Sequence, residues 1–152
     1  MHNDHSERYK PLGGRAIFVI NADGTGLRRA TAWKLNAGGL GELAWSPDGS
    51  RILFHSVAQF SDDPNLSTGD LYTIHPEGTG LERITHLPAG TGVQLGSYSP
   101  DGTKIVFATT NGATASPGSF YPDVFTMNAG GGDITPVTRT KNWEGTPSWG
   151  PA

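Results

Sequence analysis

The chain has 152 residues and a formal net charge of −3, from 14 acidic and 11 basic side chains. Glycine and proline are frequent, with 22 and 11 copies, whereas charged residues make up 16% of the chain against roughly a quarter in average proteins. Many tight turns and few charged helix faces predict an all-β protein. The charge balance provides no basic patch to neutralise phosphates, so we expect no nucleic-acid partner. Because cysteine is absent, disulfide and thiolate chemistry are excluded.

Residues 1–14 are predicted to form a polar N-terminal segment. Three charged residues precede Tyr9 and no signal-peptide hydrophobic core is evident, so this segment does not indicate export. No apolar run approaches the roughly 18 residues of a membrane span, and we expect no membrane insertion. The residues themselves leave the compartment open.

The first predicted strands lie in residues 15–31, on either side of a turn that contains Gly24. The pattern at 17–31 recurs at 71–85 and at 124–138, so that the turn glycines are 54 and 53 residues apart: Gly24, Gly78 and Gly131. Repeats of about that length, built from short strands and turns, are typical of β-propeller blades. The first turn is similar to part of a calcium loop, but it lacks the regular acidic ligands and distal Glu of an EF-hand. We therefore interpret it as a hairpin turn.

Residues 41–85 are predicted to form a complete blade of four strands, here named a to d. The strands are expected at 43–45, 51–54, 71–74 and in the residues up to Thr85. Strands a and b are joined by Ser-Pro-Asp-Gly at 46–49. Proline presets φ for the first central position of such a turn, and glycine takes the left-handed position.

A second blade of the same kind is predicted at 94–138. Its Ser-Pro-Asp-Gly turn, at 99–102, lies 53 residues after the first, counted from Pro47 to Pro100. Its strand b contains Ile-Val-Phe, which is apolar on both faces, as expected for a strand between neighbouring blades. Phe54 and Phe107 occupy equivalent positions in the two b strands, and we expect both to be buried.

Residues 146–150 are expected to supply strand a of a further blade, because Trp149 precedes Gly-Pro as Trp45 precedes Ser-Pro. The chain would then hold two full blades plus a split blade. Propellers have at least four blades, and an open arc leaves apolar faces and unpaired strand edges in water. Either two or more chains complete the ring, or the sequence is an excerpt of a longer propeller.

These motifs together resemble the repeat of TolB-type β-propellers, over residues 15–151. The shared pattern is aromatic-Ser-Pro-Asp-Gly-x-x-Ile-x-Phe, then Asp-x-Tyr/Phe-x-Ile/Met, then a turn glycine followed by Ile-Thr. The resemblance implies a partial TolB-like propeller at 15–152 and a ring of six blades, of which this chain would supply half. Of the two alternatives above, we expect a homodimer that completes the ring. It also implies a periplasmic or otherwise extracytoplasmic scaffold that binds a protein or peptide. Prolyl-oligopeptidase-type peptidases carry the same repeat, so the alternative is a hydrolase domain whose catalytic part is absent from this chain.

The sequence shows no catalytic constellation. Ser46 and Ser99 precede proline and lack a Gly-x-Ser-x-Gly elbow, and no histidine has a motif context that would make it their base. The five histidines are scattered along the chain. We therefore predict a non-enzymatic protein without a cofactor or a metal site, in which the repeat serines bond to the backbone of their own turns.

Binding is expected where the repeats stop matching, because variable loops on a rigid scaffold carry binding. The chain inserts residues 56–69 and 109–122 between strands b and c, and these b–c connections emerge on the same face as the d–a connections. The residues expected on this face are aromatic, acidic or histidine: Phe60, Asp62, Asp63, Phe120, Tyr121, Trp33, His86 and Trp143. Such a surface suits a peptide or protein segment. The alternative is that these loops merely pack over the rim of the propeller.

Overall fold

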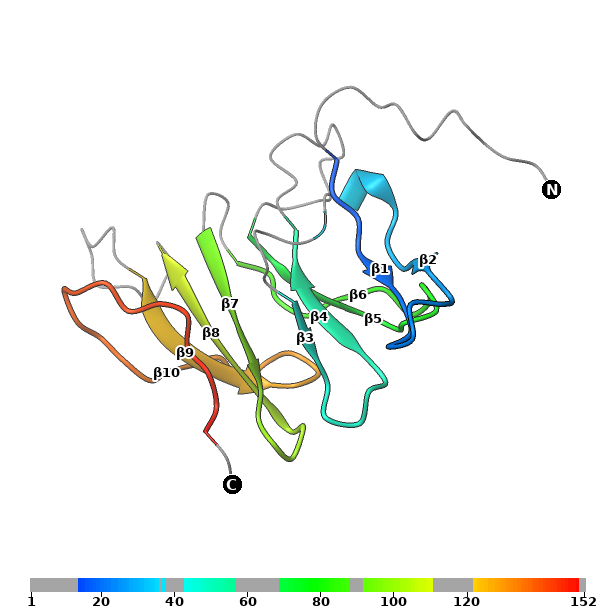
Figure 1. Ribbon diagram of the computed structural model, residues 1–152. Helices are drawn as coiled ribbons and strands as arrows, with labels where there is room; N and C mark the ends of the chain where they lie inside the picture. The colour runs from blue at the N-terminus through cyan, green and yellow to red at the C-terminus, as the bar shows by residue number, and fades with distance from the viewer. Residues whose placement is uncertain are drawn as a thin grey trace.

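The computed structural model describes residues 14–35, 37, 43–56, 69–87, 92–110 and 122–150. The strands in these ranges form three antiparallel sheets that follow one another along the chain (Figure 1). A single 3-10 turn, η2 (Trp33–Leu35), is the one helical element in the same ranges. The expected all-β class is confirmed.

The first sheet pairs β1 (Phe18–Val19) with β2 (Arg28–Arg29). The second sheet contains, in spatial order, β3 (Leu43–Trp45), β4 (Ile52–His55), β5 (Leu71–Ile74) and β6 (Glu82–Arg83). The third sheet contains, again in chain order, β7 (Gly92–Tyr98), β8 (Lys104–Thr110), β9 (Asp123–Asn128) and β10 (Thr135–Pro136). Within each sheet, every strand pairs with the next one along the chain, as in a propeller blade. The expected four-stranded antiparallel blades are confirmed, and the number of blades in a closed ring stays a prediction.

The Ser-Pro-Asp-Gly turns form the hairpins β3–β4 and β7–β8. In each turn the glycine N–H donates to the carbonyl oxygen of the serine at 2.8 Å. Gly49 and Gly102 have φ values of 70° and 71°, so both occupy the left-handed conformation that the sequence predicted. The local turn chemistry thus explains why both chain segments reverse at the same point of the repeat.

A repeated threonine fixes the outer two strands of all three sheets in the same way. The Oγ1 atoms of Thr31, Thr85 and Thr138 accept hydrogen bonds from backbone N–H groups 14 residues upstream, at 2.8, 2.9 and 2.9 Å. The donors belong to the first residues of the three repeats: Ile17, Leu71 and Val124. The three sheets are therefore copies of one unit.

Two hydrophobic clusters fill the junctions between successive sheets. Between the first and second sheets lie Ile17, Ala30, Leu35, Ala37, Ile52, Phe54, Tyr72 and Ile74. Between the second and third sheets lie Leu53, Leu71, Ile84, Val93, Tyr98, Ile105, Phe107, Phe125 and Met127. Successive residues of a strand point to opposite faces, so Leu53 and Phe54 enter different junctions. Phe54 and Phe107 have no exposed surface, which confirms the expected burial of both rings.

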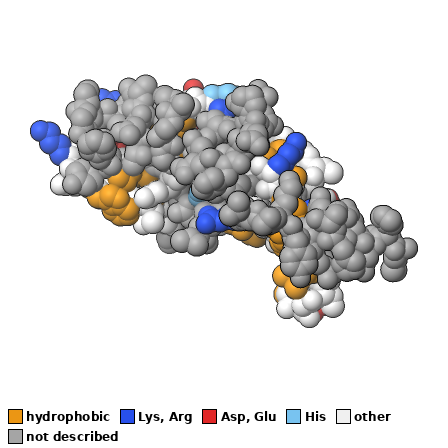
Figure 2. Space-filling view, turned by 90° about the horizontal axis from the view of Figure 1, so that it is seen from above, with side chains coloured by type: hydrophobic (Ala, Val, Ile, Leu, Met, Phe, Trp, Pro, Cys, Tyr) orange, Lys and Arg blue, Asp and Glu red, His pale blue; other side chains and the backbone are white. Residues whose placement is uncertain are grey.

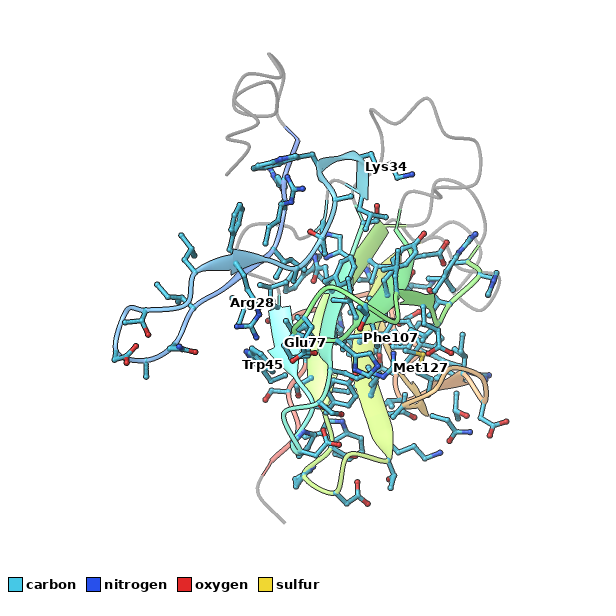
Figure 3. The ribbon with its side chains drawn as sticks, turned by 90° about the vertical axis from the view of Figure 1, so that its right-hand side faces the viewer. Arg28, Lys34, Trp45, Glu77, Phe107 and Met127 are labelled. Atoms are coloured by element: carbon cyan, nitrogen blue, oxygen red, sulfur yellow. The ribbon has the colours of Figure 1, made fainter. Side chains whose placement is uncertain are left out.

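The turn between strands c and d packs on the preceding sheet at both junctions. A Cβ atom added to Gly78 would lie 3.0 Å from the carbonyl oxygen of Ala30, and one added to Gly131 would lie 2.6 Å from that of Ile84. Arg28 also reaches this turn, where its Nε donates to the carbonyl oxygen of Pro76 at 3.2 Å (Figure 3). The turn glycines thus serve the stacking of blades as well as the turn itself.

The third sheet has an irregularity that the sequence did not predict. The register between β7 and β8 shifts between Leu95 and Ser97, which makes a β-bulge at Gly96. A Cβ atom at this glycine would lie 2.1 Å from the carbonyl oxygen of Val106, so no larger residue fits. Strand a of this blade begins at Gly92, two residues before the predicted boundary of the blade.

The segment 146–150 lies beside β7 and forms no strand. The N–H of Trp149 donates to Oγ of Ser97 at 3.2 Å, and the carbonyl oxygen of Pro147 approaches Gly96. β7 thus has the second sheet on one side and this segment on the other. Pairing of the segment as a closing strand a stays a prediction.

Candidate binding site

A buried aspartate in each full blade holds the connection that leaves strand d. Asp70, which is fully buried, accepts hydrogen bonds from Thr85 Oγ1 at 2.7 Å and from the N–H of Leu87 at 2.9 Å. It also forms an ion pair with the guanidinium of Arg83. In the second blade Oδ1 of Asp123 accepts from the N–H of Thr140 at 3.1 Å, again 17 residues downstream. Each d–a connection is therefore fastened to the start of strand c.

The sequence pattern contained both aspartates, but it gave them no role. Their signal was the shared Asp-x-Tyr/Phe motif. The two sites differ at the position of Arg83, where the second blade has Pro136. Oδ2 of Asp123 is buried and has no hydrogen-bond partner. The second anchor is therefore weaker than the first.

The described part of the predicted surface consists of Trp33, His86 and Trp143, one on each connection that follows a strand d. His86 is exposed and directly precedes Leu87, whose backbone the Asp70 carboxylate holds. Trp143 is 55% exposed, and its ring lies against Gly145, where an added Cβ atom would come within 2.7 Å of it. Viewed from the end of the molecule that carries η2, hydrophobic side chains reach the surface in several places (Figure 2).

Trp33 is half-buried in η2 and is fixed by two neighbours from the first sheet. Its ring meets Phe18 edge to face, with 5.9 Å between the ring centroids and 61° between the planes. The guanidinium carbon of Arg29 lies 5.7 Å from the Trp33 ring centre, within the range of a cation–π interaction. The other five residues predicted for this surface lie outside the described residues: Phe60, Asp62, Asp63, Phe120 and Tyr121.

A groove of about 400 Å³ opens between the two full blades at the opposite end, beside the Ser-Pro-Asp-Gly turns. Arg51 crosses it, donating from Nη1 to Thr73 Oγ1 at 3.0 Å and to the carbonyl oxygen of Gly80 at 3.2 Å, with Glu82 Oε2 at 3.4 Å. Burial raises the pKa of Tyr98, which also lines the groove, to about 12. The cationic side chain of the groove is thus already engaged by the blade itself.

The repeat serines have the structural role that the sequence predicted. Ser46 Oγ donates to Asp48 Oδ1 at 2.6 Å and accepts from the N–H of Arg51 at 2.9 Å. Ser99 makes the same pair of bonds, to Asp101 at 2.6 Å and from the N–H of Lys104 at 2.9 Å. Both hydroxyls hold their turns.

These bonds predict an acid-sensitive turn. The Ser46 hydroxyl, followed by the N–H and hydroxyl of Ser50, lowers the pKa of Asp48 from 3.8 to about 2. The folded state therefore favours the ionised carboxylate, and its support for the turn is lost as the pH falls from about 4 to about 2. An NMR titration of the carboxyl carbon should report this pKa, and Ser46→Ala should raise it towards 3.8. An identical pKa in the variant would contradict the assigned cause.

Across the ranges that the structure describes, no group of three or more His, Cys, Asp or Glu side chains is arranged to hold a metal ion. In the same ranges, no helix has the length and apolar character needed to cross a bilayer.

No protein-family model and no curated protein matches the sequence. Solved structures do match. A structure of putative TolB from Agrobacterium tumefaciens aligns over 81% of this chain with 23% identity and a TM-score of 0.60, and the alignment covers 40% of that protein. A structure of TolB from Acinetobacter baumannii aligns over 81% of this chain and 37% of its own length, with 16% identity and a TM-score of 0.36. The first alignment agrees with the stacked four-stranded sheets, and the chain therefore has a TolB-like β-propeller fold.

Proposed function

We propose that the protein is a non-enzymatic β-propeller module that binds a protein or peptide segment at its d–a connections. The observation that carries this proposal is the exposure of Trp143 on a connection whose backbone Asp123 holds. Tryptophan is enriched among the residues that dominate binding energy, because it offers a large apolar area with few rotatable bonds. A tryptophan that stays largely in water has surface available for a partner.

The backbone around this surface is ordered before any ligand arrives. Asp70 and Asp123 each accept a hydrogen bond from the connection that follows strand d, and Trp33 is held by its ring contacts. Binding to a prearranged surface avoids part of the entropy cost of ordering loops. The acidic residues predicted on the neighbouring b–c connections, Asp62 and Asp63, favour a ligand that combines apolar with basic side chains.

The test is selection from a random peptide library displayed on phage, followed by calorimetry with the enriched peptides. We expect Trp143→Ala to weaken binding about tenfold or more, because it removes an aromatic contact and leaves the fold intact. Leu81→Ala is the matched control, since Leu81 is 46% exposed but lies on the c–d turn at the other end of the blade. Equal losses in both variants, or an unfolded Trp143→Ala protein, would contradict this site.

We also propose that a second copy of the chain completes the propeller ring, so that the working module is a homodimer. The support is the apolar side chains exposed on the two end sheets of the arc, among them Phe18 and Val137. Exposed apolar sheet faces of this kind indicate a partner surface. The mass of the protein in solution, measured by light scattering, tests this proposal.

A further inference from the structure

We infer that the sheet β1–β2 of one copy packs against the sheet β7–β10 of a second copy, through a contact that already occurs twice within the chain. This interface rests on the ring completion proposed above and assigns it to particular residues. Each sheet has a forward face, which meets the following sheet, and a rear face, which meets the preceding one. In Figure 3 the end of the arc that carries β1–β2 faces the viewer.

The two internal junctions show which residues meet, and how buried they are, when one sheet packs on the next. The forward face of β1–β2 contributes Ile17 and Ala30, and that of the second sheet contributes Leu53, Leu71 and Ile84. These residues meet the rear faces of the sheets that follow, which include Tyr72 and Ile74 at the first junction and Phe125 and Met127 at the second. In filled junctions, Ala30 and Ile84 are each 5% exposed, and Tyr72 and Ile74 are 3% and 2% exposed.

The corresponding residues at the two ends of the arc are exposed. On the forward face of the third sheet, Val137 takes the place of Ala30 and Ile84 in the repeat, and it is 59% exposed. On the rear face of β1–β2, Phe18 and Ile20 take the places of Tyr72 and Ile74, and they are 47% and 53% exposed. Each end therefore presents one half of the same apolar contact, and the two halves are complementary.

The surroundings of the turn glycines support the same contact between the two ends of the arc. At the internal junctions, positions 78 and 131 lie so close to a carbonyl oxygen of the preceding strand d that no Cβ fits comfortably. Gly24 has the same left-handed backbone, with φ at 83°, but no atom lies within 4 Å of its Cβ position. The equivalent carbonyl for Gly24 is that of Val137, at the other end of the chain. In the dimer, Gly24 of one copy lies against this carbonyl of the other.

The inner strands support the same arrangement. Tyr98 and Val93 of β7 are each 8% exposed because β3 lies in front of them, whereas Trp45 and Leu43 of β3 are 50% and 47% exposed. In a two-chain ring, residues 146–150 of the second copy, which lie beside its own β7, come to face β3 of the first. Both end contacts then form at once, and the ring closes without unpaired apolar faces.

The size of the particle over a dilution series tests this interface. The wild-type chain should have twice its monomer mass of 16.0 kDa, and Val137→Asp should weaken the dimer at least tenfold, because it places a carboxylate in an apolar contact. Leu27→Asp is the control on the facing turn. Its counterpart Leu81 stays 46% exposed although its turn is packed, so position 27 lies outside the contact.

Gly24→Ala gives a second, steric test. It should also dissociate the dimer, since a Cβ atom there meets the Val137 carbonyl of the other copy. Gly49→Ala, at another left-handed glycine, should leave the dimer unchanged, because its counterpart Gly102 has room for a Cβ atom at a filled junction, with Pro47 Cδ 3.5 Å away. A wild-type chain that is monomeric at every concentration would overturn both the ring completion and the interface. A dimer that withstands both Val137→Asp and Gly24→Ala would overturn the interface alone.

Discussion

Phe107→Ala should lower the free energy of unfolding by about 3–5 kcal/mol. The ring has no exposed surface and lies in the junction between the two full blades, where it stacks on Phe125 with 5.8 Å between ring centroids. Removing it leaves a cavity that the two rigid sheets cannot close. Phe54→Ala should cost a similar amount, because Phe54 fills the preceding junction and stacks on Tyr72 at 5.7 Å. Urea denaturation followed by fluorescence measures both values.

Leu81→Ala is the control for these truncations, because nearly half of the Leu81 side chain is already in water. It should change the free energy of unfolding by less than about 0.5 kcal/mol. If Phe107→Ala had an effect as small as this, the third sheet would not pack on the second and the repeat alignment would be wrong.

Asp70→Ala should lower the free energy of unfolding by about 3–5 kcal/mol. The substitution leaves the guanidinium of Arg83 without its carboxylate and removes the acceptor of the Thr85 hydroxyl and the Leu87 N–H. The Thr85 hydroxyl, which is 1% exposed, then loses its acceptor where water replaces it poorly, and the partly buried Arg83 and Leu87 N–H lose theirs. Differential scanning calorimetry measures the loss as a fall in Tm.

Asp123→Ala is the matched comparison at the equivalent position of the next blade. Its carboxylate accepts a bond from Thr140 and has one buried oxygen without a partner, and Pro136 takes the place of Arg83 in this blade. Its removal should therefore cost clearly less than that of Asp70. Equal losses would show that the ion pair with Arg83 contributes nothing to the first anchor.

The fold was predictable because its signals are local and repeated. Ser-Pro-Asp-Gly specifies a tight turn wherever it occurs, and its recurrence, together with that of Gly24, Gly78 and Gly131, set the period of the blades. The bulge at Gly96 was not predictable in this way. It depends on the approach of the Val106 carbonyl, a contact that the repeat pattern does not contain.

The sequence predicted which connections carry the candidate residues, but it did not predict the contacts around them. The order of strands in a blade places Trp33, His86 and Trp143 on d–a connections, and the structure shows them there. The role of Asp70 could not be read from the sequence, because its partners Arg83 and Leu87 become neighbours only when strand c pairs with strand d. The groove beside Arg51 was missed for a similar reason, since its walls come from turns of two different blades.

Methyl NOE spectroscopy tests most directly whether successive sheets stack on one another as propeller blades. Labelled Leu53 and Ile84 lie on the second sheet, and Ile105 and Met127 lie on the third. Cross-peaks between methyl groups of these two pairs are the expected result, because all four side chains belong to one buried cluster. A spectrum with methyl contacts within each sheet but none between the sheets would contradict the propeller arrangement.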